Sequence, residues 1–136
     1  MASNPPTGRS AMANGNITSL TPVMQDTGTD NRVIAATSGA LCLGIAGKGT
    51  RYAPWSVIDD GYLAISGEVF EYYGQGEDNV PAKINGTVTR GDLLKADGTS
   101  LISTTADGDK YVAQARMSGV AGDIIPVLVM IGERGV

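Results

Sequence analysis

From residue 17 onward the sequence consists of short runs of β-favouring residues, separated by Asp-Gly, Asn-Gly and Thr-Gly dipeptides. Such dipeptides favour tight turns, because glycine adopts positive φ angles at no steric cost. Short strands with this punctuation are typical of a sandwich or barrel. We therefore predict an all-β fold, a single-domain β-sandwich or barrel of short strands, with at most one helical turn near 80–83 and near 118–123. The predicted strands are 17–24, 32–37, 41–46, 55–58, 62–73, 82–88, 92–96, 101–105, 111–117 and 124–131.

The first sixteen residues differ in composition from the rest of the chain. They contain the pair Pro5-Pro6 and one charged side chain, Arg9, and they lack any large aliphatic or aromatic group. A segment that buries so little apolar surface does not offset the entropy that it loses on ordering. We therefore expect residues 1–16 to form a flexible N-terminal arm that orders only against a partner, and residues 17–136 to form one β domain.

The two halves of the β region are weakly similar to each other. Three residues of the first half recur in the second at offsets of 71, 70 and 69 positions: Asp26 and Asp97, Gly28 and Gly98, Ala46 and Ala115. Two related β modules, about 17–73 and 82–132, explain these offsets. Chance coincidence of Asp-Gly turns between strands is the alternative.

The composition excludes several kinds of chemistry. The chain has no histidine, which removes His-based acid–base catalysis and histidine metal ligation, and Cys42 is its single cysteine, which removes an internal disulfide and a cysteine zinc site. Fourteen acidic against ten basic residues give a net charge of −4, which disfavours a nucleic-acid partner. We therefore expect a protein that is not an enzyme, with no cofactor, no metal and no small-molecule substrate.

Two local features have simple structural explanations. Residues 44–50 are glycine-rich, but a phosphate loop needs a hydroxyl residue directly after its lysine, and here Gly49 follows Lys48. Cys42 lies between two leucines, so we expect a small buried apolar side chain. No apolar run is long enough for a secretory signal or a membrane helix. We therefore expect synthesis in the cytoplasm and no membrane partner.

Six of the seven aromatic residues lie between Tyr52 and Tyr73. Aromatic residues near glycines are typical of binding hot spots, but the same side chains also fill a domain core. Alternation along a strand places Phe70 and Tyr72 on one face and Tyr73 on the other, which favours a mixture of the two uses. Stacking on sugar rings is a third use. The residues expected at a subunit or partner interface are Trp55, Tyr62, Tyr72 and Tyr73.

The order of the short motifs over residues 17–132 resembles a family of tailed-bacteriophage capsid decoration (cement) proteins. The matching positions of the first module are Pro22, Val23, Asp26, Val33, Ile34, Ala36, Gly44, Ile45 and Ala46. Those of the second module are Gly91, Asp92, Leu94, Asp97, Ala113, Ala115, Gly122, Asp123, Ile124 and Val127. The first module departs from the pattern, because Ala53-Pro54-Trp55-Ser56-Val57 stands where Gly-Asp or Gly-Glu is expected before the closing strand.

The resemblance implies a structural virion protein that binds the outer surface of an assembled phage head and stabilises it by bridging subunits of the major capsid protein. It also implies a homo-oligomer, with a trimer favoured, on the capsid surface after synthesis in the host cytoplasm. An alternative is a carbohydrate-binding or host-attachment module of a phage head fibre or tail appendage. The arm residues expected to bind the capsid are Asn4, Pro5, Pro6, Arg9 and Met12.

Overall fold

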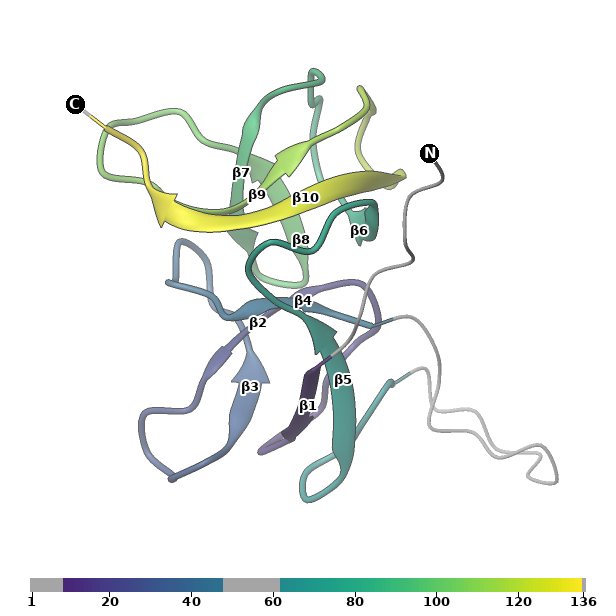
Figure 1. The fold of residues 1–136 in the computed structure, drawn as a ribbon, viewed down its shortest axis with the longest axis vertical. Coiled ribbons are helices and arrows are strands. Elements are labelled where there is room, and N and C mark those ends of the chain that lie inside the picture. The colour runs from purple at the N-terminus through teal and green to yellow at the C-terminus, as the bar shows by residue number, and fades with distance from the viewer. Residues whose placement is uncertain (1–8, 48–61, 136) are drawn as a thin grey trace, which may run out of the picture.

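The computed structural model describes residues 9–47 and 62–135 and contains ten strands in two antiparallel sheets of five strands each (Figure 1). The described residues contain no helix, so the predicted all-β fold of short strands is confirmed. None of them forms a helix that is long and apolar enough to cross a bilayer. The strands are β1 (Arg9–Met12), β2 (Pro22–Gln25), β3 (Val33–Ala35), β4 (Gly44–Ala46), β5 (Val69–Tyr73), β6 (Val80–Lys83), β7 (Leu93–Asp97), β8 (Ser100–Ser103), β9 (Lys110–Ala115) and β10 (Ile124–Glu133).

The first sheet curls until its two edge strands meet. Its order is β1-β5-β4-β2-β3. Ala13, directly after β1, forms a parallel bridge to Val33 in β3, and the Asn14 N–H donates to the Val33 carbonyl at 2.9 Å. We call β1 to β5 and their loops the first barrel. Its apolar interior contains Ala13, Ile17, Val23, Val33, Ala46, Ala64 and Phe70.

The second sheet repeats the first. Its order, β6-β10-β9-β7-β8, is that of the first sheet with every strand number raised by five. The closing contact is also equivalent, because Ile84 after β6 forms a parallel bridge to Leu101 in β8. We call β6 to β10 and their loops the second barrel, and we infer that the chain is an internal duplication. Interior residues of the second barrel that match interior residues of the first are Ile84, Val88, Leu94, Leu101, Ala115 and Ile125.

The pairing registers show that the two copies differ in one connection. The pair Ala11–Phe70 corresponds to Ala82–Ile125, so β1 and β6 are offset by 71 positions whereas β5 and β10 are offset by 55. Twenty-two residues separate β4 from β5, but only eight separate β9 from β10. The first barrel therefore carries an insertion of 14 residues before its closing strand.

The insertion corresponds to residues 48–61, which lie outside the described part of the chain. The antiparallel bridge between Ile17 and Ala64 matches that between Val88 and Gly119, with offsets of 71 and 55 positions. From Ala64 onward, equivalent residues of the two copies are therefore 55 positions apart. The predicted strand 55–58 and the residue Trp55 belong to this insertion.

The motif before the closing strand occurs in both barrels, as Gly67-Glu68 and Gly122-Asp123. The two glycines have φ angles of 91° and 92°, a conformation that strongly favours glycine. Each acidic side chain accepts the backbone N–H of the residue three positions earlier, at 3.0 and 2.9 Å. The expectation that residues 53–57 replace this motif in the first module is therefore wrong, because the insertion displaces the motif along the chain.

Deleting residues 48–61 should leave the fold intact. The deletion joins Gly47 to Tyr62, in the arrangement that Arg116 and Met117 have in the second barrel. Gly47 and Arg116, the first residues after β4 and β9, both donate a backbone N–H to the neighbouring closing strand, at 2.9 and 3.0 Å. We expect the thermal midpoint to change by only a few degrees, equivalent to about 1 kcal/mol.

Circular dichroism melting of the deleted and full-length chains measures this change. A deletion of the same length that removes β3 and its flanking turns, residues 27–40, is the control and should abolish the cooperative transition. Loss of the cooperative transition in the chain that lacks residues 48–61 would contradict the assignment of these residues as an insertion.

Residues 9–16 are part of the first barrel, which corrects the expected flexible arm. β1 pairs with β5 over four residues from Arg9 to Met12, and Ala13 is fully buried. The Asn14 side-chain amide donates to the carboxylate of Asp26. The expectation that residues up to 16 are flexible is wrong for 9–16, because backbone pairing and a buried small side chain order a segment that composition marks as polar.

Residues 80–83 form β6 rather than the helical turn that the sequence permits there. Val80 and Ala82 point into the second barrel, where both are fully buried. Pro81 occupies an outward position of the strand, opposite Pro126 of β10. Proline has no backbone N–H, so neither residue can donate a hydrogen bond between these strands. The two prolines therefore stand opposite each other at one position of the ladder.

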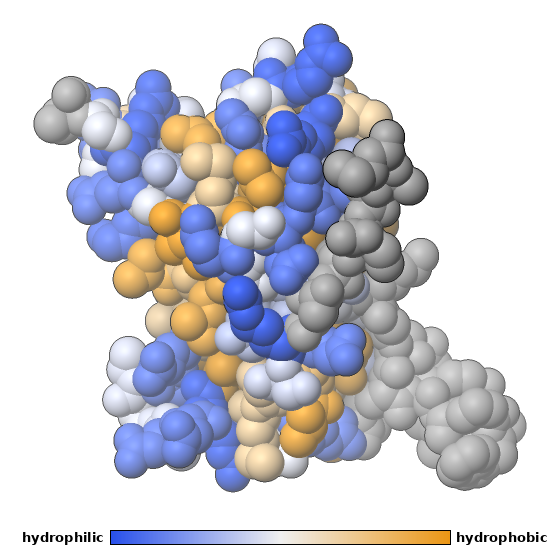
Figure 2. All heavy atoms as spheres, viewed as in Figure 1, coloured by the Kyte–Doolittle hydropathy of each residue, from blue (hydrophilic) through white to orange (hydrophobic). Residues whose placement is uncertain are grey.

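The wall of the first barrel closes one end of the second barrel. Ala36, Cys42 and Ile45 belong to the same buried cluster as the interior of the second barrel. The Gly39 N–H donates to the Ala96 carbonyl at 3.0 Å across this joint. Figure 2 shows apolar side chains gathered at the waist between the two barrels. The core of the second barrel therefore extends onto the wall of the first barrel, whose own interior is a separate cluster, and this contact favours a fixed relative orientation.

Candidate functional site

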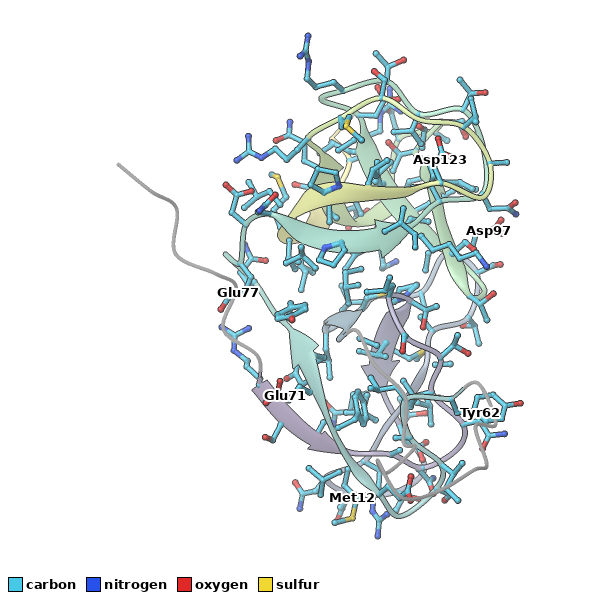
Figure 3. The ribbon with its side chains drawn as sticks, turned by 90° about the vertical axis from the view of Figure 1, so that its right-hand side faces the viewer. Met12, Tyr62, Glu71, Glu77, Asp97 and Asp123 are labelled. Atoms are coloured by element: carbon cyan, nitrogen blue, oxygen red, sulfur yellow. The ribbon has the colours of Figure 1, made fainter. Side chains whose placement is uncertain are left out.

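Two residues of the expected capsid-binding arm lie on β1, an edge strand of the first sheet. Arg9 is exposed, and its Nη2 donates to the Gln75 carbonyl at 3.4 Å. Met12 lies at the end of the first barrel that is remote from the second barrel (Figure 3). The other three arm residues, Asn4, Pro5 and Pro6, lie outside the described residues.

The half-buried Met12 and the exposed Val69 form an apolar pair that is absent from the second barrel. Met12 stands opposite Val69 of β5, whose side chain is 63% exposed. At the equivalent position of the second barrel, Lys83 stands opposite Ile124, which is 54% exposed. The first barrel therefore presents two adjacent apolar side chains where the second presents one apolar and one charged side chain. The sequence analysis did not identify Val69, although strand alternation places it on the opposite face from the buried Phe70.

The aromatic residues expected at an interface occupy different places. Tyr73 packs against the core that joins the two barrels, and Tyr72 packs against the interior of the first barrel. Tyr62 lies on the opposite side of the first barrel from Glu71 (Figure 3). Trp55 lies outside the described residues. The described members of the set therefore do not form one surface, and Tyr73 is held in an intramolecular contact.

Equivalent Asn–Asp contacts hold the first loop of each barrel. The amide of Asn14 donates to Asp26, and the amide of Asn85 donates to Asp97 at 3.3 Å, 71 positions later. The N–H of Gly28, at 3.0 Å, and the Asn14 amide lower the pKa of the Asp26 carboxyl. These carboxylates stabilise turns and do not face each other as an acid–base pair.

The Asp109 carboxylate is the strongest acid among the perturbed groups. The backbone N–H groups of Thr105 and Ala106 donate to it at 3.0 and 3.1 Å, and Lys95 Nζ lies 3.2 Å away. These contacts lower the pKa of Asp109 from 3.8 to about 2, and the backbone hydrogen bonds contribute more to the shift than Lys95 does. A carboxyl that is more acidic in the folded state stabilises the fold above its unfolded pKa, and this contribution is lost as the pH falls toward the folded pKa.

Replacing this carboxyl should reduce the acid sensitivity of the protein. In the wild type, the stabilisation by Asp109 should be complete above pH 3.8 and should disappear as the pH falls to about 2. The variant Asp109→Asn should therefore have a lower urea midpoint at neutral pH and a smaller further loss in acid. Asp107→Asn, in the same loop, is the control. Parallel pH curves for the Asp109 variant and the wild type would contradict this assignment.

Cys42 is buried, as the sequence analysis predicts. Burial raises the pKa of its thiol to about 11, so the thiolate form that is reactive toward electrophiles and metals is disfavoured. Within residues 9–47 and 62–135, no three His, Cys, Asp or Glu side chains lie close enough to hold a metal ion. The carboxylates of Asp26 and Asp109 hold turns and the thiol of Cys42 is buried, so the exposed surfaces of the described residues are the main candidates for function.

No protein-family model and no curated protein matches this chain. Its fold is similar to that of the head fiber gp8.5 N base of bacteriophage phi29, with a TM-score of 0.53 and 12% sequence identity. The similarity covers 90% of this chain and 92% of the phi29 chain, so it extends across both barrels. At this level of identity the likeness establishes the fold alone: the chain has the same overall fold as the base of a phage head fibre.

Proposed function

We propose that this protein is a structural component of a bacteriophage head, held on the outer surface of the shell. The observation that carries the proposal is the fold shared with a phage head fibre base over 90% of the chain. The resemblance of its motifs to capsid decoration proteins points to the same location. A lone buried cysteine and carboxylates that hold turns are consistent with a protein that acts by binding a partner.

The apolar pair Met12–Val69 is our candidate for contact with the shell. A partner that covers two adjacent apolar side chains removes more apolar surface from water than one that covers Ile124 beside Lys83. β1 is also an edge strand, and an extended segment of a major capsid subunit adds to such an edge through main-chain hydrogen bonds. A trimer at a local threefold position would multiply these contacts, because the second and third attachments are intramolecular.

Cosedimentation with heads assembled without this protein tests the proposal. We expect saturable binding by the wild type and at least about tenfold weaker binding by Val69→Asp, because a charge replaces apolar contact. Ile124→Asp changes the equivalent residue of the second barrel and is the matched control. Failure of the wild type to bind heads would reject the head proposal, whereas equal binding by Val69→Asp would reject only the assigned surface.

Two measurements distinguish a cement protein from a fibre base. A cement protein bridges major capsid subunits, so it should raise the temperature at which heads release DNA and should be trimeric by light scattering. A fibre base anchors a host-attachment module, and the similarity to the phi29 head fibre base favours this version. A fibre base should bind heads without changing their thermal stability. The deletion of residues 48–61 also removes Trp55 and so tests the expected role of that residue in partner contact.

A further inference from the structure

The first barrel is open at one end. A cavity of about 320 Å³ lies at this end, and we call it the mouth of the first barrel. Its lining comes from all five strands or the residues that flank them, so it is an open depression at the strand ends rather than a closed cavity. The lining residues used below are Ser10, Gln25, Asn31, Arg32, Leu43 and Tyr72.

The second barrel has no equivalent opening. Gln25 corresponds to Ala96 and Tyr72 corresponds to Val127, by the matched strand registers. Ala96 and Val127 are at most 1% exposed, within the core that the first barrel covers. The mouth therefore arises from two differences between the copies. Larger and more polar residues line it, and no second wall covers it.

The side chains around the mouth favour a ligand with hydrogen-bond acceptors and a negative charge. Gln25 and Asn31 supply amides, Ser10 supplies a hydroxyl, and Arg32 supplies a guanidinium. Among the residues that the structure describes, no carboxylate lines the mouth, and Glu71 stands opposite the lining residue Ser10 on the neighbouring strand. Arg32 Nη1 donates to the Ala13 carbonyl at 3.3 Å, and no carboxylate of the described residues forms a salt bridge with it.

Two further features match a sugar ring. Tyr72 presents an aromatic side chain, which is half-buried and tilted by 51° against Phe70 at a centroid distance of 6.4 Å. Aromatic faces pack against apolar faces of ligands, and a tyrosine also offers its hydroxyl. The cavity volume is at the lower end of the range of about 300–1,000 Å³ that small-ligand pockets occupy. The Asp26 carboxylate, which follows Gln25, alternates to the other face and is held by Asn14.

We propose that the mouth of the first barrel binds an acidic saccharide, with Arg32 pairing with the sugar carboxylate. Tyr72 packs against the ring, and the amides of Gln25 and Asn31 contact its hydroxyl groups. A depression lined by the ends of several strands suits a compact terminal sugar better than an extended peptide, which requires a groove or a sheet edge. This binding does not depend on attachment to a head, so it can fail or succeed independently of the proposed function.

Titration of the full-length protein with sodium glucuronate, followed by NMR shifts of backbone amides, tests the proposal. We expect saturable shifts centred on Arg32 and Tyr72. Glucuronic acid methyl ester, which lacks the charge, should bind about tenfold or more weakly, as expected for loss of a charge-assisted hydrogen bond. Glucose lacks the carboxylate and sodium acetate lacks the sugar ring, so both should also bind weakly. Equal binding of acetate or of glucose, or no saturable binding of glucuronate, would overturn the proposal.

Variants of the protein locate the site. Arg32→Gln keeps a donor for the Ala13 carbonyl and should weaken glucuronate binding about tenfold or more. Tyr72→Val introduces the residue of the second barrel and should also weaken binding. Arg134 lines a cavity of the same volume in the second barrel and likewise donates to a carbonyl, that of Thr104 at 3.0 Å, so Arg134→Gln is the matched control. Loss of binding in the control but not in Arg32→Gln would place the site elsewhere and reject the assignment.

Discussion

A chain that lacks residues 1–16 should lose the cooperative folding of its first barrel, and its thermal midpoint should fall by more than about 10 °C. The truncation removes the whole of β1, and with it the closing contact between Ala13 and Val33. It also removes two backbone hydrogen bonds at Ala13, to Glu68 and from Gly67, each of 2.8 Å. The buried ring of Phe70, opposite Ala11, would then face water.

Differential scanning calorimetry of three chains measures this effect. A chain that lacks only residues 1–8 retains all of these contacts and should melt within a few degrees of the wild type. Since the longer truncation can fail to express, Ala13→Asp tests the same contact at full length by placing a charge at a fully buried position. Ser10→Lys, at an exposed position of the same strand and opposite Glu71, is its charged control. Wild-type melting of the chain that lacks residues 1–16 would show that β1 contributes no stability.

The same segment shows what composition cannot predict. The sequence Arg9–Met12 contains no β-branched or aromatic residue, so strand propensity gives no signal. Its pairing is imposed from outside, by the free edge of β5 and by the small side chain of Ala13, which fits the barrel interior. The predicted strands that have turn dipeptides and β-branched residues correspond to observed strands, although the observed strands are generally shorter.

The sequence contains further evidence for the internal repeat beyond the three pairs of residues named above. Asn14-Gly15 and Asn85-Gly86 are 71 positions apart, and a β-branched residue and a threonine follow each pair at the same spacing. These residues form the equivalent loops that Asp26 and Asp97 hold. The offset then changes to 55 in the closing strand, so a search at one fixed offset misses Gly67-Glu68. Duplication with a single insertion explains both observations.

The mouth of the first barrel was only partly predictable. Tyr72 belongs to the aromatic segment that the sequence analysis identified. Gln25 and Arg32 carry no motif, and they meet Tyr72 because the curling of the sheet brings the ends of separate strands together. Comparison of the two barrels supplies part of the missing signal, since Gln25 and Tyr72 stand at positions that are buried and apolar in the second barrel, where Ala96 and Val127 occupy them.

Gly44→Ala should destabilise the protein by about 3 kcal/mol, because the added methyl group has no space. A Cβ atom at Gly44 would lie 2.0 Å from the Tyr73 carbonyl oxygen and 2.9 Å from its carbonyl carbon. Both atoms are backbone atoms of the paired strand β5, so no side-chain rotation relieves the clash. The strands must separate, and this change disturbs the joint in which Ile45 and Tyr73 pack.

Urea unfolding of Gly44→Ala measures this cost as a lower midpoint with an unchanged slope. Gly28→Ala is the control, since a Cβ at Gly28 meets only the Asp26 carboxylate at an ordinary 3.6 Å, and its midpoint should stay within about 0.5 kcal/mol of the wild type. The second barrel accepts Ala113 at the matching position, where it is fully buried. Ala113 stands opposite Val129, next to a register shift between Val129 and Gly132 that has no counterpart in the pairing of β4 with β5. If Gly44→Ala unfolds at the wild-type urea concentration, β4 and β5 are not held at the close approach on which the joint between the barrels depends.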